Sequence, residues 1–206
     1  AGFIFYYIYG RKKVQSESAL LHLLERITAR ELVTGTLETE LKEIIRERDQ
    51  IVKDKFDRLV ENAPTLDLKG PADLDKIFEK IARLLAPRLN MQTETLKQML
   101  LEREKQGSTV LSQTLAVPHI IIPGQNKFEM VIARCSEGVK FSENAPAVNT
   151  VFVLAGTKDL RNFYLRVLSA IAQIVQAKNF EKNWTSAKNQ QALKDIVLLA
   201  QRNRLH

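Results

Sequence analysis

One histidine stands in a sequence context that favours chemistry. His119 follows Pro118 and precedes three isoleucines in the segment LAVPHIIIPG. Pro118 fixes its own φ and keeps the residue before it extended, so the backbone that enters His119 is stiff. A neutral imidazole held in this way can act as a nucleophile near pH 7, whereas a ring that merely ends a strand would be inert. The residue type alone leaves both interpretations open.

The remaining histidines and the cysteine limit the chemistry available. The chain of 206 residues has only His22 and His206 besides His119, and Cys135 is its one cysteine. One cysteine excludes an internal disulfide and a CxxC metal or redox site. A transition-metal site would then need mostly carboxylates, and no such cluster occurs at ligand spacing. We expect neither a metal ion nor a cofactor.

The net charge of +7 is unevenly distributed. Residues 1–62 contain 11 Lys/Arg and 11 Asp/Glu, so residues 63–206 carry the whole excess. A basic domain can face nucleic acid, anionic lipid, a phosphorylated group or an acidic protein. The basic residues are scattered, however, and aromatic residues do not interleave with them as they would on a base-stacking surface. We therefore expect no nucleic-acid partner.

Hydrophobic periodicity predicts the elements that would position His119. Helices are expected over 72–89 and 93–106, the second ending at Gly107 as a C-terminal cap. Strand-like segments follow, namely STVL, TLAVPHIII, FEMVIARC and TVFVLAG, with TLDL as a short first strand. Three helices, at about 159–177, 179–187 and 190–204, finish the chain. This order argues for the α/β class, with one mixed sheet flanked by helices and preceded by a helical hairpin.

The first 15 residues resemble the end of a transmembrane helix. The run AGFIFYYIY is uncharged and GRKK follows it at once. Nine residues are too few to span a bilayer, and a signal peptide would carry its positive charges before the apolar run. Tyrosines at the interface with a basic juxtamembrane segment behind them are typical of a membrane helix that ends in the cytoplasm. A buried edge strand is the alternative.

Residues 16–62 are predicted to form a helical linker that turns at TGT and ends near Ala63, where NAPTLDLKGPAD breaks the pattern. Its second helix carries an apolar stripe from Leu37 to Val60 on an otherwise charged surface. Such a stripe needs a partner, which could be the first helix, a second copy of the chain or the following domain. The domains expected are thus 1–15, 16–62 and an α/β domain over 63–206.

The stretch LLEREKQGSTVLSQTLAVPHIIIPG resembles the active-site segment of the type 2 (mannitol/fructose) enzyme IIA domains of the bacterial sugar phosphotransferase system. The resemblance covers 63–206 and implies a mixed sheet with helices on both sides and His119 at the edge of a shallow surface site. It also implies that His119 accepts a phosphoryl group from the phosphocarrier protein. The matching residues are Arg103, Glu104, Gly107, Ser108, Thr109, Ala116, Val117, Pro118 and His119.

The same resemblance implies roles around His119. Arg103 would offer a planar fork of donors to the phosphoryl oxygens, unless it forms a salt bridge within EREK. Ser108 and Thr109 would add hydroxyl or backbone donors. Family members usually carry a second histidine at the start of the helix after the central strand, and this chain has Tyr164 there. A phenol can hydrogen-bond an imidazole or a phosphate but carries no positive charge.

Residues 7–63 resemble the segment after the last membrane helix in prokaryotic amino acid permeases of the amino acid, polyamine and organocation type, some of which carry an enzyme IIA-like domain at their C terminus. This implies a regulatory domain, rather than an enzyme, at the cytoplasmic side of the cell membrane, which senses a partner, a ligand or phosphorylation through the site around His119. Its partners would be the transmembrane part of the same polypeptide and the phosphocarrier protein or another regulator. One alternative is an active phosphotransfer protein that relays phosphate through His119 to sugar or protein. Another is an oligomerisation module, a homodimer through 18–61 with an inert His119.

Overall fold

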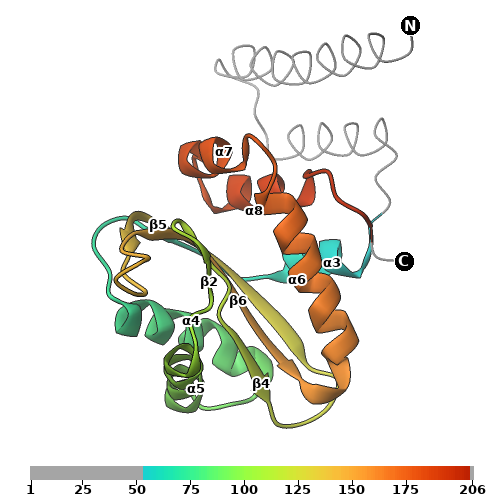
Figure 1. Cartoon of the computed structure of the whole chain (residues 1–206). Helices are drawn as coiled ribbons and strands as arrows, with labels where there is room; N and C mark the ends of the chain where they lie inside the picture. The colour runs from blue at the N-terminus through green and yellow to red at the C-terminus, as the bar shows by residue number, and fades with distance from the viewer. Residues whose placement is uncertain (1–52, 205–206) are drawn as a thin grey trace, which may run out of the picture. The chain divides into compact units, whose positions relative to one another are not determined.

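Six strands form one mixed sheet in the computed structural model, which describes residues 53–204 (Figure 1). The expectations for 1–15, for 16–52 and for His22 and His206 lie outside the described residues. The strand order is β1-β5-β6-β3-β2, and β4 also pairs with β6. The strands are β1 (Thr65–Leu68), β2 (Val110–Ser112), β3 (Leu115–Ala116), β4 (His119–Ile122), β5 (Phe128–Val139) and β6 (Val148–Thr157).

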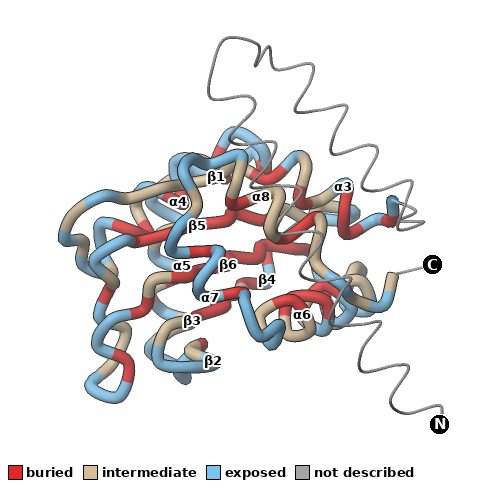
Figure 2. The backbone as a smooth tube through the Cα atoms, turned by 90° about the horizontal axis from the view of Figure 1, so that it is seen from above, coloured by how far each residue is buried: buried red, intermediate tan, exposed pale blue. Residues whose placement is uncertain are grey.

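The longest strands, β5 and β6, lie at the centre of the sheet and run antiparallel. β6 is buried along nearly its whole length, as its apolar sequence on both faces predicts (Figure 2). β1 runs parallel to β5, and β3 and β4 run parallel to β6 one after the other. A Cβ on Gly138, where φ is +76°, would lie 2.8 Å from the Cα of Ala147, so the bend at the end of β5 requires glycine.

Helices cover both faces of the sheet, which confirms the predicted α/β fold class. One core packs α4 and α5 against the sheet, and the second packs α3, α6, α7 and α8 against the other face (Figure 1). The helices are α3 (Lys55–Asn62), α4 (Leu74–Leu89), α5 (Thr93–Gln106), α6 (Arg161–Val175), α7 (Phe180–Ser186) and α8 (Gln190–Leu198), and a short 3-10 turn, η1 (Lys158–Leu160), precedes α6.

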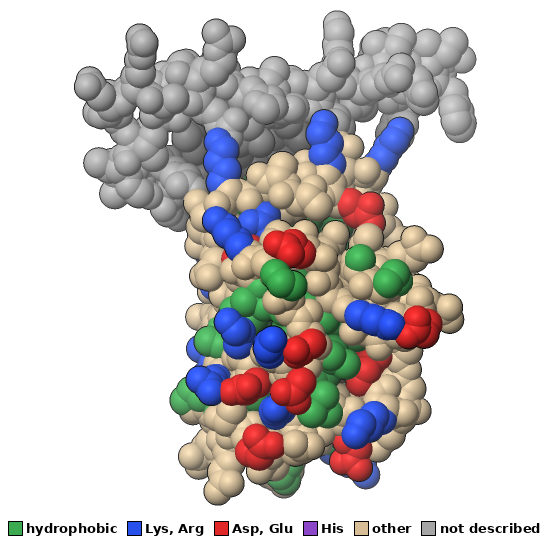
Figure 3. Space-filling view, turned by 90° about the vertical axis from the view of Figure 1, so that its left-hand side faces the viewer, with side chains coloured by type: hydrophobic (Ala, Val, Ile, Leu, Met, Phe, Trp, Pro, Cys, Tyr) green, Lys and Arg blue, Asp and Glu red, His purple; other side chains and the backbone are tan. Residues whose placement is uncertain are grey.

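The outer surface of α4 and α5 is polar. Lys97 of α5 pairs with Asp75 of α4 at 2.9 Å, and Arg83 pairs with Glu79 one turn earlier in α4. Figure 3 shows cationic and anionic side chains intermixed on the face turned toward the viewer. Their charges therefore largely offset one another there. Within the part of the chain that the structure describes, no helix is both long and apolar enough to cross a bilayer.

A buried ion cluster joins the end of the described chain to α3. The Arg202 side chain is fully buried and donates to both carboxylate oxygens of Asp54 at 2.8 Å and to Asp57 at 2.9 Å. Its guanidinium carbon lies 4.5 Å from the centroid of the Phe56 ring. The expected final helix therefore stops at Leu198 instead of continuing to 204, because the chain turns back to reach these carboxylates.

The acidic partners of Arg202 also begin α3. Asp54 accepts a hydrogen bond from the Asp57 amide, and the Asp57 carboxylate accepts one from the Asp54 amide, which forms a capping box. Phe56 and Val60 are completely buried in the core with α6 and α8. The compact unit of the domain starts at Lys53, so this last part of the expected linker packs within it.

Arg134 of β5 makes a second buried ion pair, and its guanidinium links β1 to the backbone of α7. Its Nε and Nη2 donate to the two carboxylate oxygens of Asp67 at 2.8 and 2.7 Å. Its Nη1 donates to the carbonyl oxygens of Trp184 and Ala187 at 2.8 and 2.7 Å. The hydrogen bonds from Arg134 hold the pKa of the Asp67 carboxyl below its ordinary value of 3.8.

We expect this pair to make folding stability depend on pH. Because Asp67 has a lower pKa in the folded chain than in the unfolded chain, its contribution is complete at neutral pH and is lost as the pH falls below about 4. The free energy of unfolding in urea should therefore fall more steeply toward pH 3 in the unchanged chain than in Asp67→Asn. Glu102→Gln, at an exposed position on α5, serves as the control. Parallel curves for Asp67→Asn and the unchanged chain would contradict the assignment.

Candidate functional site

His119 is the first residue of β4, and the chain on both sides of it is held by backbone hydrogen bonds. The Val117 amide donates to the Thr109 carbonyl at 2.9 Å, and the Pro118 carbonyl accepts from the Leu154 amide at 2.9 Å. The ring is half-buried, and its Nδ1 lies 3.0 Å from the carbonyl oxygen of Val117. Because a carbonyl can only accept, Nδ1 carries the proton in the neutral ring, and Nε2 presents its lone pair.

Arg103 lies on the other side of the His119 ring, in the last turn of α5. Its Nη2 is 3.1 Å from His119 Nε2, and its Nη1 donates to the carbonyl oxygen of Gly107 at 2.8 Å. A guanidinium can only donate, so the Nε2 lone pair is the acceptor in this contact. The salt bridge within EREK that the sequence left open is not formed by Arg103 in residues 53–204. The two residues that the sequence analysis put first are thus in direct contact.

The loop between α5 and β2 positions Ser108 and Thr109 differently. Thr109 is buried, and both its amide and its hydroxyl donate to the Glu104 carboxylate, the amide at 3.1 Å. Ser108 is exposed, and its hydroxyl oxygen accepts from the Val110 amide at 3.3 Å. The hydroxyl proton of Ser108 remains able to bind an anion, whereas the expected donors of Thr109 are already used.

Glu104 is a positioning residue to which the sequence analysis gave no role. Its carboxylate closes the turn that carries the chain from α5 toward the strands, and the Thr109 carbonyl then holds the Val117 backbone. The signal was present in the sequence, since Glu104 belongs to the motif that resembles the enzyme IIA segment. Its spacing of five residues from Thr109 fits no regular helical pair, so its partner could be identified only in the structure.

Tyr164 stands in the first turn of α6 and contacts His119 through its ring rather than its hydroxyl. The two ring centroids are 5.9 Å apart at 69°, an edge-to-face arrangement. The hydroxyl donates to the carbonyl oxygen of Leu154 at 3.2 Å, and burial raises the pKa of the phenol above its ordinary value. The hydrogen bond to the imidazole or phosphate that the sequence analysis considered is replaced by this bond to β6.

Tyr164→Phe is therefore expected to lower the stability of the domain. Losing the hydrogen bond to Leu154 should lower the free energy of unfolding by about 1 kcal/mol. The phosphoryl uptake by His119 that the sequence resemblance implies should keep the same rate in this variant, because the ring contact is kept. Urea unfolding and a labelling time course measure the two effects. A Phe variant that labels much more slowly would show that the hydroxyl takes part in the transfer.

Two large apolar side chains that are close to the site in sequence are exposed. Ile121, two residues after His119, lies on the same side of β4 and is 53% exposed. Leu165, next to Tyr164 on α6, is 52% exposed. In residues 53–204, no group of three or more His, Cys, Asp or Glu side chains is arranged to hold a metal ion. The site thus consists of one imidazole and one guanidinium in direct contact at the surface.

The described chain matches a known family over most of its length. The family model described as "Phosphoenolpyruvate-dependent sugar phosphotransferase system, EIIA 2" matches residues 66–199, more than half of the chain. The Nitrogen regulatory protein of Pseudomonas aeruginosa is 29% identical over 126 residues, which cover 60% of this chain and 81% of that protein. The fructose-specific EIIABC component of Bacillus subtilis is 26% identical over 126 residues, and the match spans 20% of its length.

Solved structures share the same fold. The nitrogen regulatory protein IIA-Ntr of Neisseria meningitidis has a TM-score of 0.62 at 24% identity, covering 68% of this chain and 99% of that one. Enzyme IIA mannitol of Escherichia coli has a TM-score of 0.54 at 18% identity, covering 65% of this chain and 94% of that one. The family match runs from β1 into the chain after α8 and takes in Arg103 and His119. The chain therefore belongs to the EIIA type 2 family of the phosphoenolpyruvate-dependent sugar phosphotransferase system.

Proposed function

We propose that the chain is a regulatory domain that receives a phosphoryl group on Nε2 of His119 and passes the resulting change to a membrane amino acid transporter. One observation carries the first half of this proposal. Nδ1 of His119 is held by the Val117 carbonyl, which leaves the lone pair on Nε2, and the Arg103 guanidinium lies 3.1 Å from that atom. A nucleophile and a cationic donor fork thus share one surface site.

The proposed step forms one bond and breaks one. The Nε2 lone pair attacks phosphorus, and the bond between phosphorus and the nitrogen of the donor phosphohistidine breaks, its electron pair leaving with the donor. The His119 ring keeps its Nδ1 proton and its hydrogen bond to Val117 throughout. Arg103 must turn away from the lone pair before the attack, and its N–H groups then face the phosphoryl oxygens.

The rim of the site supports docking of a protein donor. Ile121 and Leu165 are large, apolar and exposed beside His119 and Tyr164. Exposed apolar side chains around a charged centre are typical of surfaces that bind another protein. The phosphocarrier protein is the donor that the family resemblance implies. An Escherichia coli relative was solved as a complex of enzyme IIA mannitol with phosphorylated enzyme IIB, which supports protein docking in this family.

A regulatory role is favoured over a relay by two observations. Two of the relatives are called nitrogen regulatory proteins. The position where a second histidine would stand holds Tyr164, whose buried hydroxyl donates to Leu154 and offers no positive charge to a phosphoryl group. A phosphoryl group adds roughly two negative charges at the surface, which can reorganise the cationic side chains nearby without being passed on.

The link to a transporter rests on the sequence of residues 7–63. Their resemblance to the segment that follows the last membrane helix of amino acid permeases supports a tether over 1–15 and a helical linker over 16–62, ahead of the domain at 63–206. The protein should then be found at the cytoplasmic side of the cell membrane. Fractionation of cells that express the native gene checks this: recovery in the membrane fraction is expected, and recovery wholly in the soluble fraction would contradict the tether.

Labelled phosphoenolpyruvate tests the role of His119. The chain is incubated with enzyme I, the phosphocarrier protein and a sugar-specific enzyme IIB, and the label is followed over time. If the domain is regulatory, the chain should take up label and keep it. His119→Gln should abolish the labelling, and His22→Gln should leave it unchanged. Label that moves on to enzyme IIB would favour the relay instead. A chain that takes up no label would exclude phosphorylation and leave an inert site, as in an oligomerisation module.

A further inference from the structure

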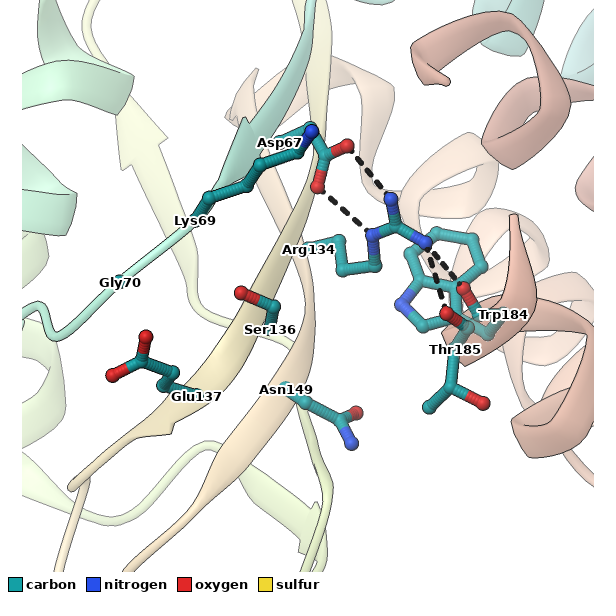
Figure 4. Close-up of a pocket in the computed structure, with 9 residues that line it drawn as sticks. All are labelled: Asp67, Lys69, Gly70, Arg134, Ser136, Glu137, Asn149, Trp184 and Thr185. Carbon is teal, nitrogen blue, oxygen red and sulfur yellow. Dashed lines mark hydrogen bonds and ion pairs between the residues drawn. The ribbon is translucent and has the colours of Figure 1, made fainter. Parts of the chain in front are cut away.

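Two cavities open along β1, one at each end of the strand. The cavity beside Trp184 has a volume of about 500 Å³ and lies where β1 and β5 end and β6 begins (Figure 4). Side chains of both charges line it, namely Asp67, Lys69, Arg134 and Glu137, and Arg134 is already bonded to Asp67 and to α7. This cavity therefore favours no one kind of ligand.

The cavity at the start of β1 differs because its charged lining is entirely cationic. It has a volume of about 490 Å³, which suits a small-molecule ligand. It is lined by residues 62–65, which lead into β1, by Arg88 of α4 and by residues of the first two turns of α8. Arg88 and Lys194 are the charged residues among them.

This second cavity is separate from the site around His119. Among the described residues β1 is an edge strand, and β5 and β6 lie between it and β4, which begins at His119. Three strand spacings separate β1 from β4, or roughly 14 Å. A small ligand in the cavity would therefore not touch the imidazole.

Arg88 reaches the cavity from the last turn of α4. Its Nε donates to the Glu129 carboxylate at 2.7 Å, whereas its Nη1 and Nη2 have no hydrogen-bond partner among residues 53–204. Glu129 offsets part of the charge of Arg88 but does not line the cavity. The guanidinium thus keeps two neighbouring donor groups for an anion.

Lys194 reaches the same cavity from α8, and it is half-buried. Its Nζ donates to the carbonyl oxygen of Glu61 at 2.9 Å and forms no ion pair within the described part of the chain. Burial and the charge of Arg88 lower the pKa of this ammonium group, against the opposite effect of Asp195 and Glu61. The two cations therefore act on each other around the edge of the sheet, and an anion between them would relieve their repulsion.

Thr65 adds a hydroxyl group to the lining. Its Oγ1 is buried and has no hydrogen-bond partner within residues 53–204. Thr65 comes two residues before Asp67 on β1, so both side chains lie on the side of the sheet that α7 covers. A buried hydroxyl without a partner is costly, so an oxygen atom of a ligand would be favoured beside it.

We propose that this cavity binds the phosphate group of a small phosphate monoester. Nη1 and Nη2 of Arg88, Nζ of Lys194 and the Thr65 hydroxyl would donate to its oxygens. A phosphate monoester carries roughly two negative charges and three terminal oxygens, which matches two cations and a hydroxyl better than the single charge and two oxygens of a carboxylate. The inference depends on this cavity alone and holds whether or not His119 is phosphorylated.

Two further features of the cavity restrict the ligand. Glu129, Glu61 and Asp195 stand behind the two cations and limit the positive charge, which disfavours a ligand with more than one phosphate group. The amide side chains of Asn62 and Gln190 line the rest of the cavity and suit a hydroxylated remainder.

Calorimetric titration of the whole chain with glycerol 3-phosphate, ribose 5-phosphate and glucose 6-phosphate tests the proposal. At least one of these esters is expected to bind, and the same compound without its phosphate should bind at least roughly 100-fold more weakly. Malate, which carries two negative charges on carboxylates, should bind roughly tenfold more weakly than the ester. Binding by none of the three esters, or equal binding by the unphosphorylated compound or by malate, would overturn the proposal.

Three substitutions locate the site. Arg88→Gln should weaken binding of the ester at least tenfold, because it removes a charge and the two-pronged donor. Lys194→Gln keeps a donor for the Glu61 carbonyl but removes the charge, so a loss of roughly tenfold is expected as well. Thr65→Val keeps the shape of the side chain and removes the hydroxyl. A smaller loss, roughly fivefold, is expected for that change.

Arg83→Gln, also on α4, is the matched control for the loss of an arginine, and it should bind the ester as the unchanged chain does. His119→Gln should also bind normally, which separates this site from the proposed phosphoryl acceptor. Arg88 is exposed, so its variant remains informative even if Thr65→Val fails to fold. Unchanged affinity in both Arg88→Gln and Lys194→Gln would place the ligand elsewhere and overturn the assignment.

Discussion

Arg103→Ala is expected to slow phosphorylation of His119 by roughly 100- to 1,000-fold, the loss that follows removal of one donor from a group that stabilises developing charge. The guanidinium is 3.1 Å from Nε2, and no other cationic side chain is in hydrogen-bond contact with His119 within the described residues. The initial rate of labelling from the phosphorylated phosphocarrier protein measures the effect. Arg103→Lys should recover only part of the rate, because an ammonium group does not reproduce the two-pronged donor.

Arg83→Ala is the matched control for this experiment. Arg83 lies on α4, is exposed and, among the residues 53–204, pairs with Glu79 one turn away, so its loss removes a cation of the same type without touching the site. Labelling at the normal rate is expected. If Arg103→Ala labels as fast as Arg83→Ala, the contact between Arg103 and His119 is structural, and the phosphoryl oxygens are held by other groups.

Arg202→Met is expected to destabilise the domain by about 3 kcal/mol or more, which corresponds to a melting temperature lower by roughly 6 to 12 °C. Met fills a similar volume, so the loss comes from the ion pairs that Arg202 makes with the buried carboxylates of Asp54 and Asp57, of which Asp57 keeps its contact with Arg204. The contact with the Phe56 ring is lost as well. Thermal and urea unfolding of the whole chain, followed by the fluorescence of Trp184, measure the effect.

Two further variants identify the cause of that loss. Arg83→Met removes an exposed arginine and should change stability by no more than about 0.5 kcal/mol. Adding Asp54→Asn and Asp57→Asn to Arg202→Met removes the two buried carboxylate charges that have lost Arg202 and should restore part of the lost stability. If Arg202→Met is as stable as Arg83→Met, the cluster contributes nothing and the domain is held by its apolar cores alone.

The central part of the fold follows from local sequence pattern. TVFVLAG is apolar on both faces, which predicts a strand covered on both sides, and β6 is that strand. The helices α4 and α5 lie close to the expected ranges, because Asp73 caps the first and Gly107 ends the second. These features depend on residues that are only a few positions apart, so they can be predicted from the sequence pattern.

The strands around His119 were predicted less well. The sequence suggested one strand over TLAVPHIII, but the structure divides it into β3 and β4, with Val117 and Pro118 between them. Pro118 has no amide hydrogen and cannot complete the ladder, so pairing with β6 resumes at His119. The break matters for the site, because it turns the Val117 carbonyl toward Nδ1 of His119.

Contacts between distant residues could not be derived from the sequence. The pairing of Arg202 with Asp54 spans nearly the whole domain, and no local pattern predicts it. The orientation of the Tyr164 hydroxyl toward Leu154 likewise depends on how α6 packs on β6. The cavity beside Trp184 combines the ends of three strands with α7, so the residues that line it come together only after folding. The contact between Arg103 and His119 was expected, because both residues belong to the motif that carries the family resemblance.

The Arg202 cluster brings the first and last parts of the domain within bonding distance of each other. A domain whose first and last parts meet can be rejoined there and opened elsewhere, which is the condition for circular permutation. Linking the residues after Arg204 to Lys53 and opening the chain in the exposed 124–126 turn should preserve the sheet, because no strand is cut. The fold of this domain therefore does not depend on the order in which its elements are connected. A host protein could carry the domain as an internal insertion as readily as at one end.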